Sequence, residues 1–200
     1  MTKITSQEKE YYSKIFSHLD FSNDEISFAE FEDCTFRECN FSESHFSDCQ
    51  FIDCLFVKCN LSIVDVSRSK FTGVTFEDCK LVGIDWSKVN WSSLALSSPI
   101  EFYKCLINDS SFFGLSLDEI VIEACKAQGV DFRSGSFNSA NFTGTDFLNS
   151  LFNETDLTYA DFTDAVNYSI DINYNEIRKA KFCRLEAIAL LNGLDIELVD

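Results

Sequence analysis

Large apolar residues recur at every fifth position along this 200-residue chain. The pattern runs from Phe21 to Leu96 and then, shifted by one residue, from Phe102 to Phe182. On an α-helix, steps of five would place successive members about 140° apart, and on a flat strand they would alternate between faces. These residues share one interior only if the chain turns a corner every five residues. The period therefore predicts a solenoid built from short stacked units.

A second column of small or apolar residues lies two positions before the large ones. It includes Cys34, Cys39, Ser44, Cys49, Cys54, Cys59, Ala140, Thr145, Ser150, Thr155, Ala160 and Ala165. Positions two apart point to the same side of an extended segment, so each unit sends one small and one large side chain inward. A sandwich of ordinary strands is the alternative, but it does not account for so many units with a single shift of phase.

Two of the units carry a family resemblance. Residues 140–144 read Ala-Asn-Phe-Thr-Gly and residues 160–164 read Ala-Asp-Phe-Thr-Asp. They resemble the consensus of the pentapeptide-repeat family, which is a small residue, Asp or Asn, Leu or Phe, and two variable positions. The resemblance implies an all-β fold, a right-handed quadrilateral β-helix of about eight coils over residues 19–184. At ~4.8 Å between stacked strands, this is a rod roughly 40 Å long.

The interruptions of the pattern predict where the rod is irregular. Residues 1–18 are expected to be a lead-in or cap, because solenoid ends need a cover. The phase slip at 97–101 contains the only proline, Pro99, and is interpreted as one extra residue at a corner. The two indoles just before it, Trp86 and Trp91, predict a locally widened coil. Ala127 and Asn167 occupy large-residue positions, so we expect distortion at both.

The last residues, 185–200, are expected to form a capping and dimerisation module. Residues 184–192 have the spacing of a short helix, and residues 194–198 alternate like a half-buried strand. A cap alone would account for the helix, whereas the additional apolar strand indicates a second subunit. The resemblance also implies a two-fold dimer formed by such a C-terminal module. The candidate dimer residues are Leu185, Ile188, Leu191, Leu194, Ile196 and Leu198.

Composition narrows the class of protein. The net charge of −17 and pI near 4.3 argue against direct nucleic-acid binding, which needs Lys and Arg against phosphates. Eight of the nine cysteines lie in the small inward column and are expected to be buried free thiols rather than disulfides or metal ligands. The chain opens without a secretory signal and has no apolar run long enough for a membrane span. We therefore expect a cytoplasmic protein.

Three segments resemble one functional subgroup of the family. Residues 125–133 resemble a segment of the plasmid-borne quinolone-resistance proteins, and residues 164–172 and 190–198 look like the albicidin-resistance immunity protein. This resemblance implies a homodimer that binds DNA gyrase, with topoisomerase IV as a second candidate, by imitating duplex DNA. The quinolone-resistance proteins carry two long loops between coils, and the uninterrupted pattern predicts none here. The immunity-type members are therefore the closer likeness.

Outward carboxylates are the candidate contacts with gyrase. Assigning units to faces in turn places Phe31, Phe51, Phe71, Phe112, Phe132 and Phe152 on one face, which is then the most acidic. Its candidate contact residues are Glu30, Glu32, Asp33, Asp53, Asp131, Glu154 and Asp171. A scaffold that binds an unrelated protein is the alternative function. We expect no enzymatic activity and no cofactor, because the sequence shows no nucleophile–base pair, phosphate loop or His–carboxylate cluster.

Overall fold

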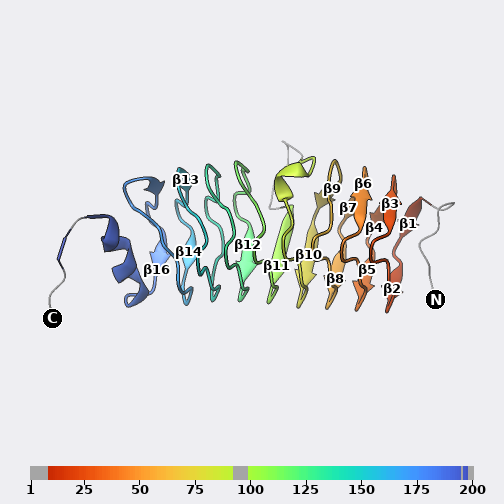
Figure 1. Cartoon of the computed structure of the whole chain (residues 1–200), viewed down its shortest axis with the longest axis horizontal. Helices are drawn as coiled ribbons and strands as arrows, with labels where there is room; N and C mark the ends of the chain where they lie inside the picture. Colours follow the sequence, from red (N-terminus) through yellow and green to blue (C-terminus); the bar gives the residue numbers. More distant parts are fainter. Residues whose placement is uncertain (1–8, 92–98, 195, 198–200) are drawn as a thin grey trace.

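The computed structural model describes residues 9–91, 99–194 and 196–197. Its strands are short and follow one another around a rod, with the two ends of the chain at opposite ends (Figure 1). The strands are β1 (Glu10–Tyr12), β2 (Ile15–Ser17), β3 (Glu25–Ser27), β4 (Glu30–Glu32), β5 (Thr35–Arg37), β6 (His45–Ser47), β7 (Gln50–Ile52), β8 (Leu55–Val57), β9 (Lys70–Thr72), β10 (Val74–Glu77), β11 (Ile100–Tyr103), β12 (Val121–Glu123), β13 (Thr155–Asp156), β14 (Asp161–Phe162), β15 (Asn175–Glu176) and β16 (Lys181–Phe182). Two 3-10 helices complete the described elements, η1 (Trp86–Lys88) and η2 (Glu186–Leu194).

All of the strand pairings in the described residues are parallel, and nearly all of them join residues 20 positions apart. One sheet has the order β1-β4-β7-β9, and a longer one has the order β12-β11-β10-β8-β5-β2. In β4 and β7, for example, Phe31 lies opposite Phe51. Twenty residues contain four five-residue units, so each coil has four sides. The expected right-handed quadrilateral β-helix of about eight coils is confirmed.

The core consists of the repeating large residues, stacked ring on ring along each side. The ring centroids of Phe36 and Phe56 lie 4.5 Å apart with nearly parallel planes. Neighbouring sides meet edge to face, as in Phe31 against Phe36. Aromatic pairs in these two arrangements stabilise beyond the area that they bury. The repeat therefore fills the rod with aromatic side chains and leaves no room inside for a ligand.

The small inward column is buried as expected. Eight cysteines are buried free thiols, and Cys183 is half-buried. The thiols bond to backbone carbonyls of the preceding coil, as Cys54 Sγ does to the Phe31 carbonyl at 3.2 Å. Burial raises the pKa of Cys54 to about 12, so this thiol stays protonated at neutral pH. The inward cysteines therefore act as small core residues, not as nucleophiles.

The rod begins earlier than the boundary predicted at residue 19. Strands β1 and β2 already pair with β4 and β5, and Tyr11 and Phe16 are fully buried. Tyr11 stacks on Phe31 at 5.0 Å between centroids. Lys14 occupies the small inward position two residues before Phe16, and a charged residue there favours a cap over a regular coil. The aromatic stacking is sufficient to hold these residues in the first coil.

The prediction of one extra residue near Pro99 is wrong. Strand β10 pairs with β11, and Phe76 lies opposite Phe102, which is 26 positions further along the chain. Asn90 still bonds to Ser69, so the extra residues follow Trp91. This coil therefore has six residues more than a regular one, instead of the single extra residue that the phase slip predicted. Leu96, counted as a repeat position, lies outside the described residues.

One of the two weak repeat positions distorts the rod. At Ala127 the register is regular, and its neighbour Lys126 pairs with Asp146. At Asn167, which has φ of 58°, the next residue, Tyr168, is buried in place of the missing large side chain. Downstream, Phe152 pairs with Ile170, only 18 positions away. Distortion is thus confirmed at Asn167 and is not found at Ala127. The small apolar side chain of Ala127 stays in the core, whereas the polar side chain of Asn167 does not.

The C-terminal module differs from its prediction. The expected helix is the 3-10 helix η2, and Leu190 rather than Leu191 is the leucine packed against the core. Ile196 and Glu197 are not in a strand, and Leu198 lies outside the described residues.

Candidate protein-binding surface

Four sides of the rod can be followed from coil to coil through their stacked large residues. Face A carries Tyr11, Phe31, Phe51, Phe71, Leu117, Phe137 and Leu157. Face B carries Phe16, Phe36, Phe56, Phe76, Phe102, Ile122, Phe142 and Phe162. Face C carries Phe21, Phe41, Leu61, Leu81, Ile107, Ala127 and Phe147, and face D carries Ile26, Phe46, Val66, Trp86, Phe112, Phe132 and Phe152. The chain visits the faces in this order, so face D adjoins face A at a corner.

The 26-residue coil changes the face to which the later units belong. The ring of Phe112 stacks on that of Trp86, with centroids 6.0 Å apart, and Ser111 pairs with Asp85. Phe112, Phe132 and Phe152 therefore lie on face D and not in line with Phe31. The single acidic face expected from the sequence is an error, because it assumed a slip of one residue. Its seven candidate carboxylates divide between two adjoining faces.

Four candidate contact residues lie together on face A, in the first coils. Glu30 and Glu32 flank Phe31 on β4, and Asp33 follows them at the corner. Asp33 accepts a hydrogen bond of 2.7 Å from the Ser13 hydroxyl. Asp53 stands one coil further along, in the same corner column as Asp33. Within the residues that the structure describes, no Lys or Arg forms an ion pair with any of these four carboxylates.

The other three candidates lie on face D and its corners, towards the C-terminal end. Asp131 forms an ion pair of 2.7 Å with Arg133, whose hydrogen bonds lower the Asp131 pKa. Glu154 accepts a hydrogen bond from Ser134 at 3.4 Å. Asp171 accepts bonds from the backbone and side-chain nitrogens of Asn173, beside the C-terminal helix. Glu154 and Asp171 thus accept hydrogen bonds from nearby side chains, and the charge of Asp131 is balanced by Arg133.

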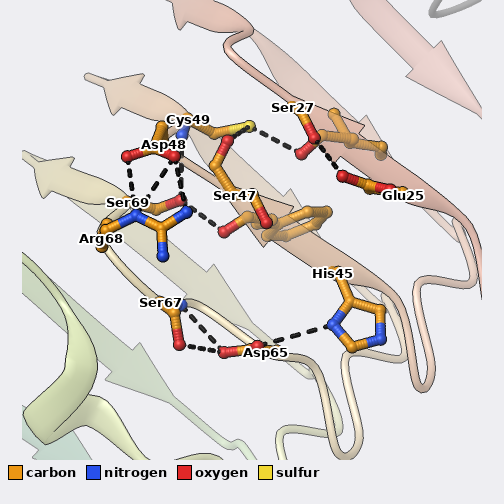
Figure 2. A network of polar contacts seen from close by, with 12 residues as sticks. Glu25, Ser27, His45, Ser47, Asp48, Cys49, Asp65, Ser67, Arg68 and Ser69 are labelled. Atoms are coloured by element: carbon orange, nitrogen blue, oxygen red, sulfur yellow. Dashed lines mark hydrogen bonds and ion pairs between the residues drawn. The ribbon is translucent and has the colours of Figure 1, made fainter.

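The first coils of face D hold a network of polar and charged contacts, drawn in Figure 2. Arg68 makes bonds of 2.8 to 3.2 Å to both carboxylate oxygens of Asp48, one coil away. Burial opposes the charge of Asp65, but bonds from Ser67 and His45 lower its pKa overall. Each acidic side chain here is matched by donors from its own or the next coil. This part of face D is therefore less available to a partner's cations than face A.

The corrected faces differ clearly in net charge. Each five-residue unit is assigned to the face of its large residue, over residues 9–91 and 99–184 with His neutral. Faces A and D then carry −5 each, face B −1 and face C −2. Because A and D share a corner, most of the negative charge lies on one half of the rod's circumference. The sequence alone does not reveal this asymmetry of charge, because the assignment of later units to faces depends on the length of the irregular coil.

Sequence reasoning missed two residues at the start of this acidic half. Tyr12 lies on face A between the carboxylates of neighbouring strands and is half exposed. The charge of Glu10, followed by burial and Glu30, raises the Tyr12 pKa. Phe28 lies at the corner between D and A with its ring largely in water. Phe28 lies outside the five-residue repeat, and Tyr12 lies before the predicted first coil. The repeat pattern therefore gives no signal for either residue.

Among the described residues, no group of three or more His, Cys, Asp or Glu side chains could hold a metal ion. Two open hollows of about 500 and 420 Å³ lie near the last coils, lined mainly by Asn, Ser, Asp and Glu. No helix in the described part of the chain has the length and apolarity needed to cross a membrane.

The candidate dimer residues are largely on the surface of the C-terminal end. Leu185 is 81% exposed, and Ile188, Leu194 and Ile196 are also exposed, whereas Leu191 is half-buried. Exposed apolar side chains gathered at one end of a molecule are typical of an interaction surface. Leu198 cannot be placed, because it lies outside the described residues.

The fold defines the class of protein: a four-sided β-solenoid, here with its negative charge concentrated on two adjoining faces. A family model described as a pentapeptide repeat region matches residues 29–99 and 95–162. These matches cover more than half of the chain, which therefore belongs to the pentapeptide-repeat family. A search of curated proteins finds no match.

Solved structures of one plasmid-mediated fluoroquinolone resistance protein, QnrB1, are similar in fold. A trypsin-treated form has a TM-score of 0.62 and 19% identity, covering 95% of this chain and 100% of that one. A second trypsin-treated form has a TM-score of 0.51 and 18% identity, covering 96% and 92%. Full-length QnrB1 has a TM-score of 0.50 and 18% identity, covering 94% and 100%. At these identities the likeness concerns the fold alone.

Proposed function

We propose that this protein binds DNA gyrase, with topoisomerase IV as a second candidate, and protects it from a topoisomerase poison. In this proposal the rod imitates duplex DNA and competes for the enzyme's DNA-binding surface, conferring antibiotic resistance or self-immunity. The observation that best supports this proposal is the concentration of carboxylates on the two adjoining faces A and D of the solenoid. The proposal places the protein in the cytoplasm with gyrase, and assigns it neither enzymatic activity nor a cofactor.

Charge density supports the comparison with DNA. Two subunits of −17 carry −34. Two rods end to end extend roughly 80 Å at ~4.8 Å per coil, which gives about one charge per 2.4 Å. Duplex DNA carries one charge per ~1.7 Å. A rod of this density is attracted to a basic groove, and the attraction weakens with salt.

A C-terminal homodimer would give the rod this length. The exposed apolar residues Leu185, Ile188, Leu194 and Ile196 are the proposed contacts, together with Leu191 and Leu198. They lie at the end of the rod opposite the unpaired carboxylates of the first coils. Dimerisation there would leave both acidic ends free, as a partner that binds along the rod requires.

The identity of the poison is left to experiment. The uninterrupted pattern, which favoured the immunity-type relatives, is broken at the 26-residue coil. The fold likeness to a fluoroquinolone resistance protein and the resemblance of residues 164–172 and 190–198 therefore support two different poisons. Both belong in the test.

The experiment measures plasmid supercoiling by gyrase holoenzyme with increasing amounts of this protein. It is repeated with a fluoroquinolone and with an albicidin-type poison, following cleaved DNA. We expect inhibition at high protein and reduced cleavage with at least one poison. Absence of both effects would refute the proposal and leave a scaffold for another partner as the function.

A charge-reversal pair locates the contact. The first variant combines Glu30→Lys, Glu32→Lys and Asp33→Lys on face A. The control combines Glu77→Lys, Asp78→Lys and Glu101→Lys on face B, with the same change in net charge. We expect the first to weaken inhibition at least tenfold and the control to weaken it clearly less. Equal effects would show that only total charge matters and would remove face A as the contact.

A further inference from the structure

Phe28 combines a left-handed backbone, which the fold imposes at this corner, with a large apolar side chain that neither the corner nor the core requires. Its φ is 58°, in the left-handed region, where a bulky side chain is a rare exception. Its side chain is also 61% exposed, although 19 of the 21 Phe residues belong to the core or pack against it. A polar residue would suit this corner better, and the ring is not part of the buried core. A strained, exposed residue of this kind points to a binding role.

Other residues at the same corner position are chemically different. Most of the left-handed residues are Asp, Glu, Asn, Ser, Lys or Gly, which suit an exposed turn. Only three large apolar residues occur there in the described chain: Phe28, Ile63 and Tyr159. Tyr159 accepts a hydrogen bond of 3.1 Å from Lys179, which gives it a local partner. Ile63 is 63% exposed but lies on the corner of face C, away from the acidic half.

The surroundings of Phe28 favour a cationic partner. Lys9 Nζ lies 5.1 Å from the centre of the Phe28 ring, within the range of a cation–π contact. Lys9 precedes Glu10, which pairs in register with Glu30. The ring is thereby placed at the edge of the carboxylates of β1 and β4. One cation from this chain already rests on it.

Tyr12 adds a second ring to the same surface. It lies on β1 opposite Glu32, is 50% exposed, and bonds to Glu10 at 3.4 Å. Phe28 and Tyr12 thus border the carboxylates of Glu10, Glu30 and Glu32. Two rings beside several unpaired carboxylates match the guanidinium group, which stacks on aromatic faces and forks onto carboxylates. Lysine, a hydrated point charge, uses such a surface less well.

We propose that Phe28 and Tyr12 are the aromatic centre of a docking surface for an arginine side chain of a basic protein partner. The inference rests on the proposed function in one respect, which is that gyrase is the expected owner of this arginine. Charge complementarity selects the partner, since faces A and D are the acidic half of the rod. The aromatic rings then distinguish arginine from other cations.

The test exploits the strain at Phe28, because stability and binding should change in opposite directions. Phe28→Asn places a residue that tolerates left-handed backbone at this corner. We expect its Tm to rise by about 3 °C and its inhibition of gyrase to weaken about tenfold. Ile63→Asn is the matched control, with the same relief of strain on another face. It should raise Tm similarly and leave gyrase inhibition unchanged.

A second probe separates this inference from the proposed function. Deca-arginine and deca-lysine peptides are titrated into the wild type, Phe28→Asn, Tyr12→Ser and Ile63→Asn. We expect the wild type and Ile63→Asn to bind deca-arginine several-fold more tightly than deca-lysine, and the other two to lose this preference. If the wild type fails to act on gyrase but shows this preference, the proposed function fails and the arginine surface stands.

Two results would overturn the inference. One is equal binding of both peptides by the wild type and Phe28→Asn, even if both proteins inhibit gyrase. The other is a loss of dimer mass in Phe28→Asn by light scattering, which would make this surface an interface between copies of the chain.

Discussion

The ring of Phe76 stacks on the ring of Phe102, with centroids 5.3 Å apart and planes within 10° of each other. The two residues are 26 positions apart in the chain, whereas Phe36 and Phe56 on the same face are 20 apart. The stack therefore continues unbroken across the irregular coil. It shows that the insertion leaves the core intact and changes only which later residues share a face.

Removing the insertion should shorten the coil without unfolding the rod. Deleting residues 93–98 returns the coil to 20 residues while keeping the chain on either side of it. Because Phe76 and Phe102 already stack, we expect Tm, measured by circular dichroism, to change by only about 2–4 °C, which corresponds to roughly 1 kcal/mol. Loss of the β-sheet spectrum would show that the inserted residues are needed for folding.

Truncation in the ring stack should be costly. Phe56 lies between Phe36 and Phe76, with ring centroids 4.5 and 5.0 Å away. Phe56→Ala removes both stacking contacts and leaves a cavity, so we expect the free energy of unfolding to fall by about 3–5 kcal/mol. Phe113→Ala, at a half-exposed ring outside the repeat, is the control and should cost less than about 1 kcal/mol. Chemical denaturation compares the two, and equal losses would contradict the stacked core.

Thiol labelling should separate Cys183 from the other cysteines. Eight thiols are buried and closed to a reagent, and burial raises the Cys54 pKa to about 12, so this thiol also lacks the reactive thiolate at pH 8. We expect an aromatic disulfide reagent to label one thiol per native chain and all nine after denaturation. Cys183→Ser should abolish the native signal. Rapid labelling of several thiols in the native protein would contradict the buried column.

The turn at Gly73 should resist substitution more than the turn at Gly114. Both have left-handed φ, of 64° and 69°. A Cβ at Gly73 would lie only 2.3 Å from Asp53 Oδ1, whereas at Gly114 it meets nothing within 4 Å. We expect Gly114→Ala to cost about 1 kcal/mol of unfolding free energy for its backbone alone, and Gly73→Ala to cost more.

A double-mutant comparison checks the cause. Adding Asp53→Ala to Gly73→Ala should recover the excess over Gly114→Ala, as measured by chemical denaturation. If the double variant is no more stable than Gly73→Ala, the Asp53 side chain does not lie beside Gly73.

Acidification should weaken the ion pair of Asp131 and Arg133. Hydrogen bonds from Arg133 lower the folded-state pKa of Asp131 below its ordinary value. A depressed pKa contributes stability that is fully present above the unfolded pKa of about 3.9 and is lost as pH falls through the folded pKa. Because Arg133 is largely exposed, the contribution should stay below about 1 kcal/mol.

Nuclear magnetic resonance can follow this titration directly. The Asp131 carboxyl carbon should titrate at higher pH in Arg133→Gln than in the wild type. The Asp48 carboxyl, paired with Arg68, is the internal control and should titrate unchanged in this variant. An unchanged Asp131 titration would contradict the ion pair.

Much of the fold follows from local rules that the sequence displays. The interval of five between Phe31, Phe36 and Phe41 forces corners, and the small column before each Phe identifies both inward positions. The candidate surface was less predictable. Glu30, Glu32 and Asp33 lie next to one another in the chain, so any register keeps them together. Asp131 and Glu154 follow the irregular coil, and their face depends on a register that the repeat does not reveal.

The sequence by itself determined the solenoid, the aromatic core, the buried thiols and the negative charge of this protein, because each depends on spacing within a few residues. Only the tertiary structure decided that six residues are inserted after Trp91, that the chain enters the rod by residue 10, and that faces A and D share the acidic half. The physical reason is that register is set between coils. Phe76 stacks on Phe102, 26 positions further along the chain, and the interval of five does not specify this contact.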